Sequence, residues 1–66
     1  MKRWNRAKRE DVERPDIDAF LAEMLAVCKK HGFSLGHEDS HGAFEVYDYD
    51  AWCDNWLMDA MDCTKT

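Results

Sequence analysis

The sequence has no apolar run near the roughly 20 residues that a membrane-spanning helix needs, and its start lacks the apolar core of a signal peptide. Its three cysteines are odd in number and show no C-x-x-C spacing. Reduced thiols in a cytoplasm are the simplest account of that pattern. We therefore expect a cytoplasmic protein whose cysteines stay reduced.

Catalytic motifs are also missing. A serine–histidine–aspartate relay cannot be built from Ser40, His41 and Asp39, because neighbouring turn residues cannot reach one another in the required order. No glycine-rich phosphate loop is present, and no spacing pairs a cysteine with a histidine for nucleophilic catalysis. We therefore expect no enzymatic activity and no cofactor.

The chain has little length from which to build a core. A domain of 66 residues buries only about 60% of its unfolded surface, so it usually needs a metal, a partner copy or tight helix packing. Its apolar content of 45%, with 12% aromatic residues, is too high for a disordered chain. The composition predicts a folded mini-domain, with homodimerisation as one source of additional stability.

The net charge of -5 is unevenly distributed. Residues 1–14 hold six basic and three acidic side chains, a net of +3, whereas residues 15–66 hold three basic and eleven acidic ones, a net of -8. Pro15 marks the boundary because proline restricts the residue before it and fits the first turn of a helix. We expect a basic N-terminal arm (1–14), helical or mobile, and a single domain (15–66).

The arm combines an indole with guanidinium and ammonium groups, as proteins that bind nucleic acids do. These residues are Arg3, Trp4, Arg6, Lys8 and Arg9. No recognised nucleic-acid-binding motif accompanies them. The competing interpretation is a solvated arm that keeps the protein soluble or folds back on the acidic body.

One amphipathic helix follows Pro15. Apolar side chains recur at offsets 0, 3, 4, 7, 8 and 11, namely Ile17, Phe20, Leu21, Met24, Leu25 and Cys28. Asp16 is a plausible N-cap, and Gly32 supplies the left-handed residue that ends a helix.

A β-hairpin is expected over residues 33–47. Side-chain alternation favours pairs whose numbers sum to 81, so that Leu35 lies opposite Val46 and His37 opposite Phe44 on one apolar face. Asp39 and Gly42 then flank a two- or four-residue turn around Ser40-His41.

A second helix is expected to begin near Asp48 or Asp50. Trp52, Cys53, Trp56, Leu57 and Ala60 share its apolar side. The resulting fold is an α+β, α-β-β-α mini-domain in which two helices pack on one face of a two-stranded antiparallel hairpin. Trp52 and Trp56, on successive turns, are typical of a core, and the competing interpretation is an interface with a partner or second copy.

Two functional surfaces remain to be weighed. His37 and His41 are suitable zinc ligands, but no H-E-x-x-H or C-x-x-C frame supports them, so they are weak metal candidates beside a structural role in the turn. A set of side chains on the second helix and the hairpin tip could instead contact a protein by electrostatic complementarity. These residues are Asp54, Met58, Asp59, Asp62, Ser40 and His41.

Several segments resemble a group of small uncharacterised proteins encoded by tailed bacteriophages and prophages. They are Phe20-Leu21, the run 27–33 (VCKKHGF), the run 37–44 (HEDSHGAF) and Trp56-Leu57. The resemblance implies a phage-encoded accessory protein in the cytoplasm of a bacterial host. We expect it to bind a host macromolecule, as an inhibitor or anti-defence factor, with nucleic-acid binding by the arm as the alternative.

Overall fold

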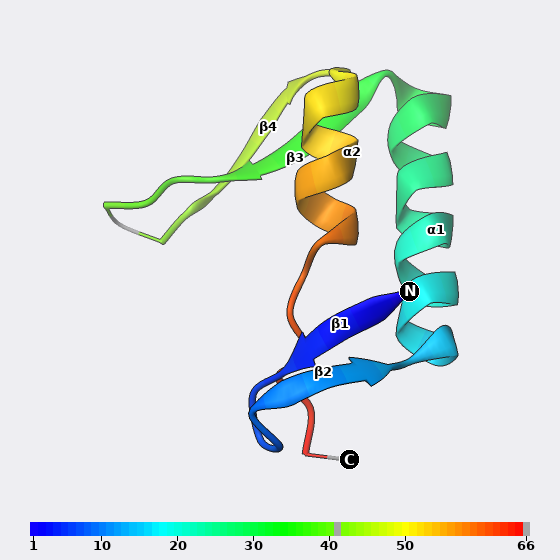
Figure 1. Cartoon of the computed structure of the whole chain (residues 1–66). Coiled ribbons are helices and arrows are strands. Elements are labelled where there is room, and N and C mark those ends of the chain that lie inside the picture. The colour runs from blue at the N-terminus through cyan, green and yellow to red at the C-terminus, as the bar shows by residue number, and fades with distance from the viewer. Residues whose placement is uncertain (41, 66) are drawn as a thin grey trace.

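The computed structural model describes residues 1–40 and 42–65, which form two β-hairpins and two helices (Figure 1). In chain order the elements are β1 (Lys2–Asn5), β2 (Glu10–Glu13), α1 (Pro15–His31), β3 (Phe33–His37), β4 (Phe44–Asp48) and α2 (Ala51–Met58). The α+β class is confirmed. The order is ββαββα rather than α-β-β-α, because residues before Pro15 pair as strands.

Helix α1 follows the apolar periodicity of its sequence and ends where expected. Gly32 adopts the left-handed conformation (φ 75°), and its backbone N–H donates to the carbonyl oxygen of Cys28 across 2.9 Å. The predicted cap at the other end is wrong. Arg14 occupies the N-cap position and Pro15 begins the helix, so Asp16 lies in the first turn instead.

The second hairpin has the register that its sequence predicts. Leu35 pairs with Val46 and His37 with Phe44, and the ring centroids of His37 and Phe44 are 6.0 Å apart in an edge-to-face contact. A bond from the N–H of Glu38 to the carbonyl oxygen of Ala43 continues the ladder and leaves a four-residue loop. His41, at the centre of that loop, lies outside the described residues.

The predicted apolar face of this hairpin is not its buried face. Phe44 and Val46 are 76% and 65% exposed, whereas Ser34 and Gly36 are buried. Both helices contact β3, but β4 contacts only β3 among the described elements. The hydroxyl of Ser34 accepts a bond from the N–H of Asp50 (2.8 Å) and so links β3 to the start of α2. The helices therefore cover one strand rather than a whole face.

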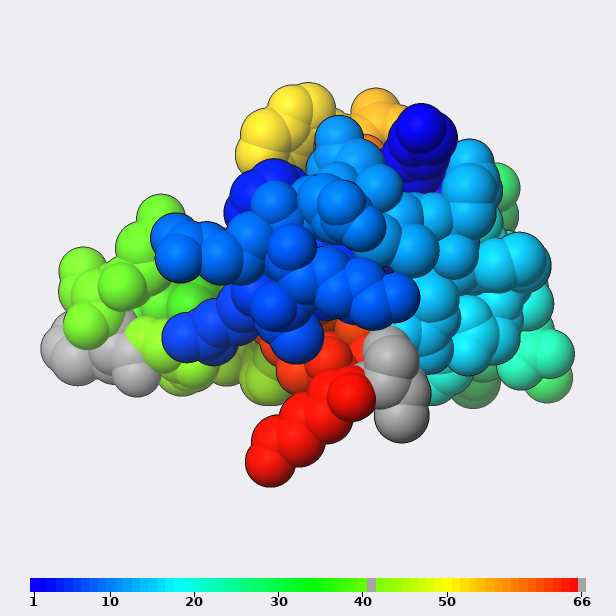
Figure 2. All heavy atoms as spheres, turned by 60° about the horizontal axis from the view of Figure 1, so that its bottom comes forward, coloured from blue at the N-terminus to red at the C-terminus, as the bar shows by residue number. Residues whose placement is uncertain are grey.

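Residues 1–14 form neither a helix nor an extended tail. β1 and β2 pair antiparallel, from Lys2 opposite Glu13 to Asn5 opposite Glu10. Figure 2 shows this blue hairpin lying against the red C-terminal segment and the cyan start of α1. The pattern of charged residues in this segment did not predict a hairpin. The contacts that hold the hairpin in place join the N-terminal and C-terminal ends of the chain, and no local sequence pattern shows them.

Helix α2 is shorter than its sequence pattern predicts. It ends at Met58, and the N–H of Ala60 donates to the carbonyl oxygen of Leu57 in a tight final turn. Beyond it, the N–H of Asp62 donates to the carbonyl oxygen of Trp4 (2.7 Å), and Asn5 and Asp62 form a parallel bridge. The apolar pattern predicted that the helix would continue beyond Met58. Backbone hydrogen bonds to β1 instead hold the segment around Asp62 in an extended conformation.

The hydrophobic core is small. Among the described residues, only Leu21 and Cys28 are apolar side chains classed as buried. Phe20, predicted on the inner face of α1, is 60% exposed. The buried polar side chains Arg3, Asn5, Ser34 and Asp62 supply much of the remaining interior. Polar contacts therefore hold the two hairpins to the helices.

Candidate functional site

The most exposed aromatic surface of the helices is the tryptophan face of α2, formed by Trp52 and Trp56. Trp52 is 72% exposed and Trp56 40% exposed, although both were expected in the core. They line a shallow hollow of about 480 Å³ with Leu57 and Ala60. The core interpretation is wrong because the hairpin covers α2 only from β3, which leaves both indoles in contact with water.

A second hollow adjoins the first beneath the β3–β4 hairpin. It has a volume of about 320 Å³, and both tryptophans also line it, with Leu35 and His37 on the hairpin side. In Figure 1 the two hairpins extend to the same side of the molecule, with α2 between them. The tryptophan face thus borders both hollows.

His37 lines the second hollow without forming a recognisable metal site. Its Nδ1 is 3.8 Å from a carboxylate oxygen of Asp39, and its ring packs on Phe44. Within residues 1–40 and 42–65, no cluster of three or more histidine, cysteine or carboxylate side chains is placed to hold a metal. The other proposed ligand, His41, lies outside the described residues. Zinc binding by His37 and His41 together therefore stays a prediction.

The hairpin tip contains one further candidate contact that the structure describes. Ser40 is exposed, and its backbone N–H donates to the carboxylate of Glu38 across 2.7 Å. Glu38 therefore supports the turn from within the tip. The hydroxyl of Ser40 remains on the surface, at the outer end of the hairpin.

The acidic side chains predicted to contact a partner do not form one continuous surface on α2. Asp59 is exposed at the end of the helix, but the carboxylate of Asp54 accepts a hydrogen bond from the hydroxyl of Tyr49, which raises the pKa of that phenol. Asp62 lies beyond the helix and is only 1% exposed. The prediction that Asp62 contacts a partner is therefore wrong, because its carboxylate is used inside the protein.

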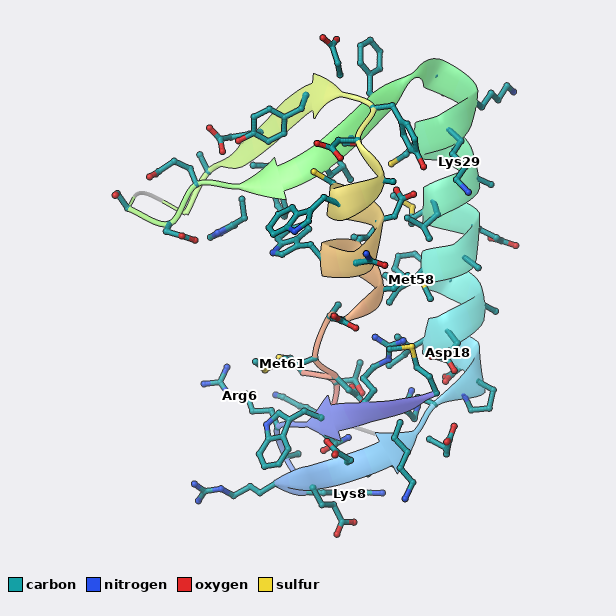
Figure 3. All side chains as sticks on the ribbon, turned by 45° about the horizontal axis from the view of Figure 1, so that its top comes forward. Arg6, Lys8, Asp18, Lys29, Met58 and Met61 are labelled. Atoms are coloured by element: carbon teal, nitrogen blue, oxygen red, sulfur yellow. The ribbon has the colours of Figure 1, made fainter. Side chains whose placement is uncertain are left out.

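Met58 is also not a free surface side chain. It is half-buried on the side of α2 that faces α1, as Figure 3 shows, and its carbonyl oxygen accepts from Arg3. Met61 and Arg6 instead project on the side of the molecule away from α1 (Figure 3). Met61 is 56% exposed and was not among the predicted contacts.

The N-terminal hairpin exposes most of the predicted nucleic-acid-binding residues. Trp4, Arg6, Lys8 and Arg9 are all exposed at or near its turn. Asn5 shapes that turn, because its side-chain oxygen accepts from the N–H of Lys8 and its carbonyl oxygen from the N–H of Arg9, both across 2.8 Å. An indole and three cations therefore share one end of the hairpin.

Arg3 must be removed from that set. It is only 3% exposed, and its guanidinium donates to the carbonyl oxygens of Met58 (2.8 Å) and Ala60 (2.7 Å) and to the carboxylate of Asp18. The bond from Arg3 lowers the pKa of Asp18. Arg3 thus joins β1 to both helices and cannot reach a phosphate.

A buried polar cluster around Asp62 was not predicted from the sequence. Its carboxylate accepts from the hydroxyl and N–H of Thr64, from the side chain of Arg14 (2.8 Å) and from the amide of Asn5 (2.9 Å). The Thr64 hydroxyl is the main cause of the lowered pKa of Asp62. No local sequence signal marks this cluster, because most of its partners lie some 50 residues apart.

Comparisons of this chain with protein-family models, with curated proteins and with solved structures gave no match. Within the described part of the chain, no helix combines the length and apolar character needed to cross a membrane. The functional argument therefore depends on the surfaces described above.

Proposed function

We propose that this protein is a non-enzymatic binding protein whose tryptophan face takes an apolar segment of a partner protein. The observation that supports this proposal is the exposure of Trp52 and Trp56 in a hollow beside Leu57 and Ala60. Tryptophan is enriched among the residues that dominate binding energy in protein interfaces, where it fills well-packed pockets. Burying both indoles would remove much of the apolar surface that α2 leaves in water.

The border of the tryptophan face indicates the chemistry of the partner. Asp59 lines the first hollow, and His37 and Asp39 line the second. Carboxylates around an apolar centre favour an apolar segment with flanking lysine or arginine side chains, because opposite charges steer the encounter. The favoured partner is thus a protein segment with an apolar centre and basic ends.

The resemblance to proteins of tailed phages supports a bacterial host protein as that partner. The corresponding biological role is that of a host-protein inhibitor or an anti-defence factor in the cytoplasm of the host cell. Self-association is a further part of the proposal and would use a surface other than the tryptophan face.

Nucleic-acid binding is the second candidate function. The observation that favours it is the group of Trp4, Arg6, Lys8 and Arg9 on one hairpin end. Such binding would weaken steeply with salt, because each phosphate contact releases condensed counterions. Replacing Arg6 and Arg9 with glutamine would reduce both the affinity for single-stranded DNA and its salt dependence.

The assignment of protein binding to the tryptophan face can be tested with matched variants. Tagged wild-type protein, a Trp52→Ala/Trp56→Ala variant and a Phe20→Ala variant are each incubated with bacterial lysate, and captured proteins are identified by mass spectrometry. Phe20 is the control because it is an aromatic residue of 60% exposure on the other helix. We expect a partner that the wild type and Phe20→Ala capture and the double variant does not. Equal capture by all three proteins would contradict the assignment to the tryptophan face.

A further inference from the structure

Strand β4 leaves one backbone edge uncovered, on a surface separate from the tryptophan face. Among the described elements, only β3 brings its backbone close to the backbone of β4. Its sequence, Phe-Glu-Val-Tyr-Asp, contains aromatic and β-branched residues that favour strands. In Figure 1 the β3–β4 hairpin extends away from the two helices toward its tip.

The hydrogen-bond pattern fixes which backbone groups face that open edge. In an antiparallel pair, opposite residues alternate between bonded and non-bonded pairs. The N–H of Tyr49 donates to the carbonyl oxygen of Gly32, and the N–H of Glu38 to that of Ala43. The odd-numbered residues of β4 therefore bond to β3, and the N–H and C=O groups of Phe44, Val46 and Asp48 point outward.

This edge has few of the features that usually prevent strand pairing. Proteins protect edges with lysine, proline, bulges or charged residues, and β4 has no lysine, proline or bulge, although Glu45 and Asp48 are charged. The other hairpin differs. Acidic residues occupy three of the four positions of β2, and β1 is bridged to Asp62. β4 is thus the edge best suited to pair with another strand.

The area of the molecule points to an additional interface. A folded monomer of 7.8 kDa exposes about 4,400 Å² of surface, and this chain exposes 5162 Å². The excess of about 800 Å² equals what one partner buries in an interface of standard size. A two-stranded hairpin is also marginal by itself, and three or more strands give independent stability.

We infer that a second copy of this chain pairs with β4, antiparallel about a two-fold axis through Val46, to form a continuous four-stranded sheet. Val46 then lies opposite Val46 of the second copy, and Phe44 opposite its Asp48. All outward N–H and C=O groups of the strand find partners in this register. A shift of two residues would instead place Glu45 opposite its own copy, where like charges repel.

The same pairing brings apolar surface together. Leu35 and Val46 are neighbours across the hairpin, so their counterparts in the second copy extend the row across the dimer axis. Val46 and Leu35 also line a hollow of about 270 Å³ with Phe33 and, from α1, Met24 and Val27. In the dimer, this hollow of one copy would meet the same hollow of the second copy beside the two-fold axis. A second copy is the favoured occupant because the excess exposed area of this chain is close to what one partner buries in an interface of standard size.

Substitution of Val46 tests the pairing without breaking the hairpin. The N–H of Val46 points away from β3, so Val46→Pro removes an edge donor without removing a backbone bond to β3, whereas Val46→Thr keeps that donor. Light scattering across a concentration series should give the wild type and Val46→Thr about twice the 7.8 kDa mass of one chain. Val46→Pro should weaken association about tenfold or more while circular dichroism shows a folded chain. A monomeric wild type at all concentrations would overturn the inference.

Amide hydrogen exchange separates this dimer from one formed by another surface. In the paired sheet, the N–H of Val46 exchanges slowly, and its protection increases with protein concentration. A dimer in which Val46 exchanges fast would overturn the inference, as would protection that appears only when a different protein is added. The Trp52→Ala/Trp56→Ala variant should show the same protection of the Val46 N–H as the wild type. A failure of the dimer inference can therefore be distinguished from a failure of the proposed binding function.

Discussion

The side-chain amide of Asn5 donates to the carboxylate of Asp62 across 2.9 Å, although 57 positions separate the two residues. Both side chains are 1% exposed. Because a buried carboxylate is costly unless it is hydrogen-bonded, this contact depends on the N-terminal hairpin and the C-terminal segment being in place together. The two ends of the chain therefore stabilise each other.

Replacing Asp62 with asparagine tests this interdependence. The change keeps the size of the side chain but removes the charge that Arg14 and Thr64 contact, so we expect a lower melting temperature in circular dichroism. Asp59→Asn is the matched control, because Asp59 is exposed and should leave the melting temperature nearly unchanged. Equal melting temperatures for the two variants would contradict a stabilising role for the Asp62 cluster.

Arg3 should contribute strongly to stability. Arg3→Met removes three partly buried hydrogen bonds and leaves two carbonyl oxygens and Asp18 without this donor, at a cost of about 3 kcal/mol in urea unfolding. Arg6→Met, at an exposed position of the same hairpin, should change the free energy of unfolding by less than about 0.5 kcal/mol. A small effect of Arg3→Met would show that the hairpin docks without it.

Stability should fall at acid pH. The bond from Arg14 lowers the pKa of Asp16 to about 2, and the pKa values of Asp18 and Asp62 are also lowered. A carboxyl whose pKa is lower in the folded state stabilises the fold above its unfolded pKa, and this contribution disappears as pH falls through the folded pKa. Unfolding experiments should therefore show stability decreasing from about pH 4 toward pH 2.

The cause of the Asp16 shift can be tested directly by NMR titration of its carboxyl carbon. Arg14→Gln removes the guanidinium that lies 2.9 Å from the carboxylate, so the pKa of Asp16 should rise toward its ordinary value of 3.8. The N–H of Ile17 also donates to Asp16, and this bond remains in the variant. An unchanged pKa of Asp16 in this variant would show that backbone N–H groups at the start of α1, and not Arg14, cause the lowered pKa.

Gly32 should be sensitive to substitution for a backbone reason. An added Cβ would meet nothing within 4 Å, but φ is 75°, a conformation that residues with side chains disfavour. Gly32→Ala should therefore lower the free energy of unfolding by about 1 kcal/mol. Gly32→Asn should cost less, because asparagine tolerates left-handed geometry better than alanine. Equal losses would point to a different origin of the effect.

Local signals in the sequence determined α1, the register of β3 with β4 and the start of α2. The period of the apolar residues and the glycine at position 32 define α1, and Asp50 accepts from the N–H of Trp52 as a cap should. Each of these features depends on residues close in sequence or on side-chain alternation. Such interactions are readable before any tertiary contact is known.

Tertiary structure alone decided the N-terminal hairpin, the end of α2 and the exposure of the tryptophans. Arg3 and Asp62 resemble ordinary surface charges in the sequence, yet both are buried by partners far along the chain. Trp52 and Trp56 fit a core pattern, yet β3 covers too little of α2 to enclose them. Periodicity shows which side of a helix is apolar, but only the packing of distant segments determines whether that side is covered.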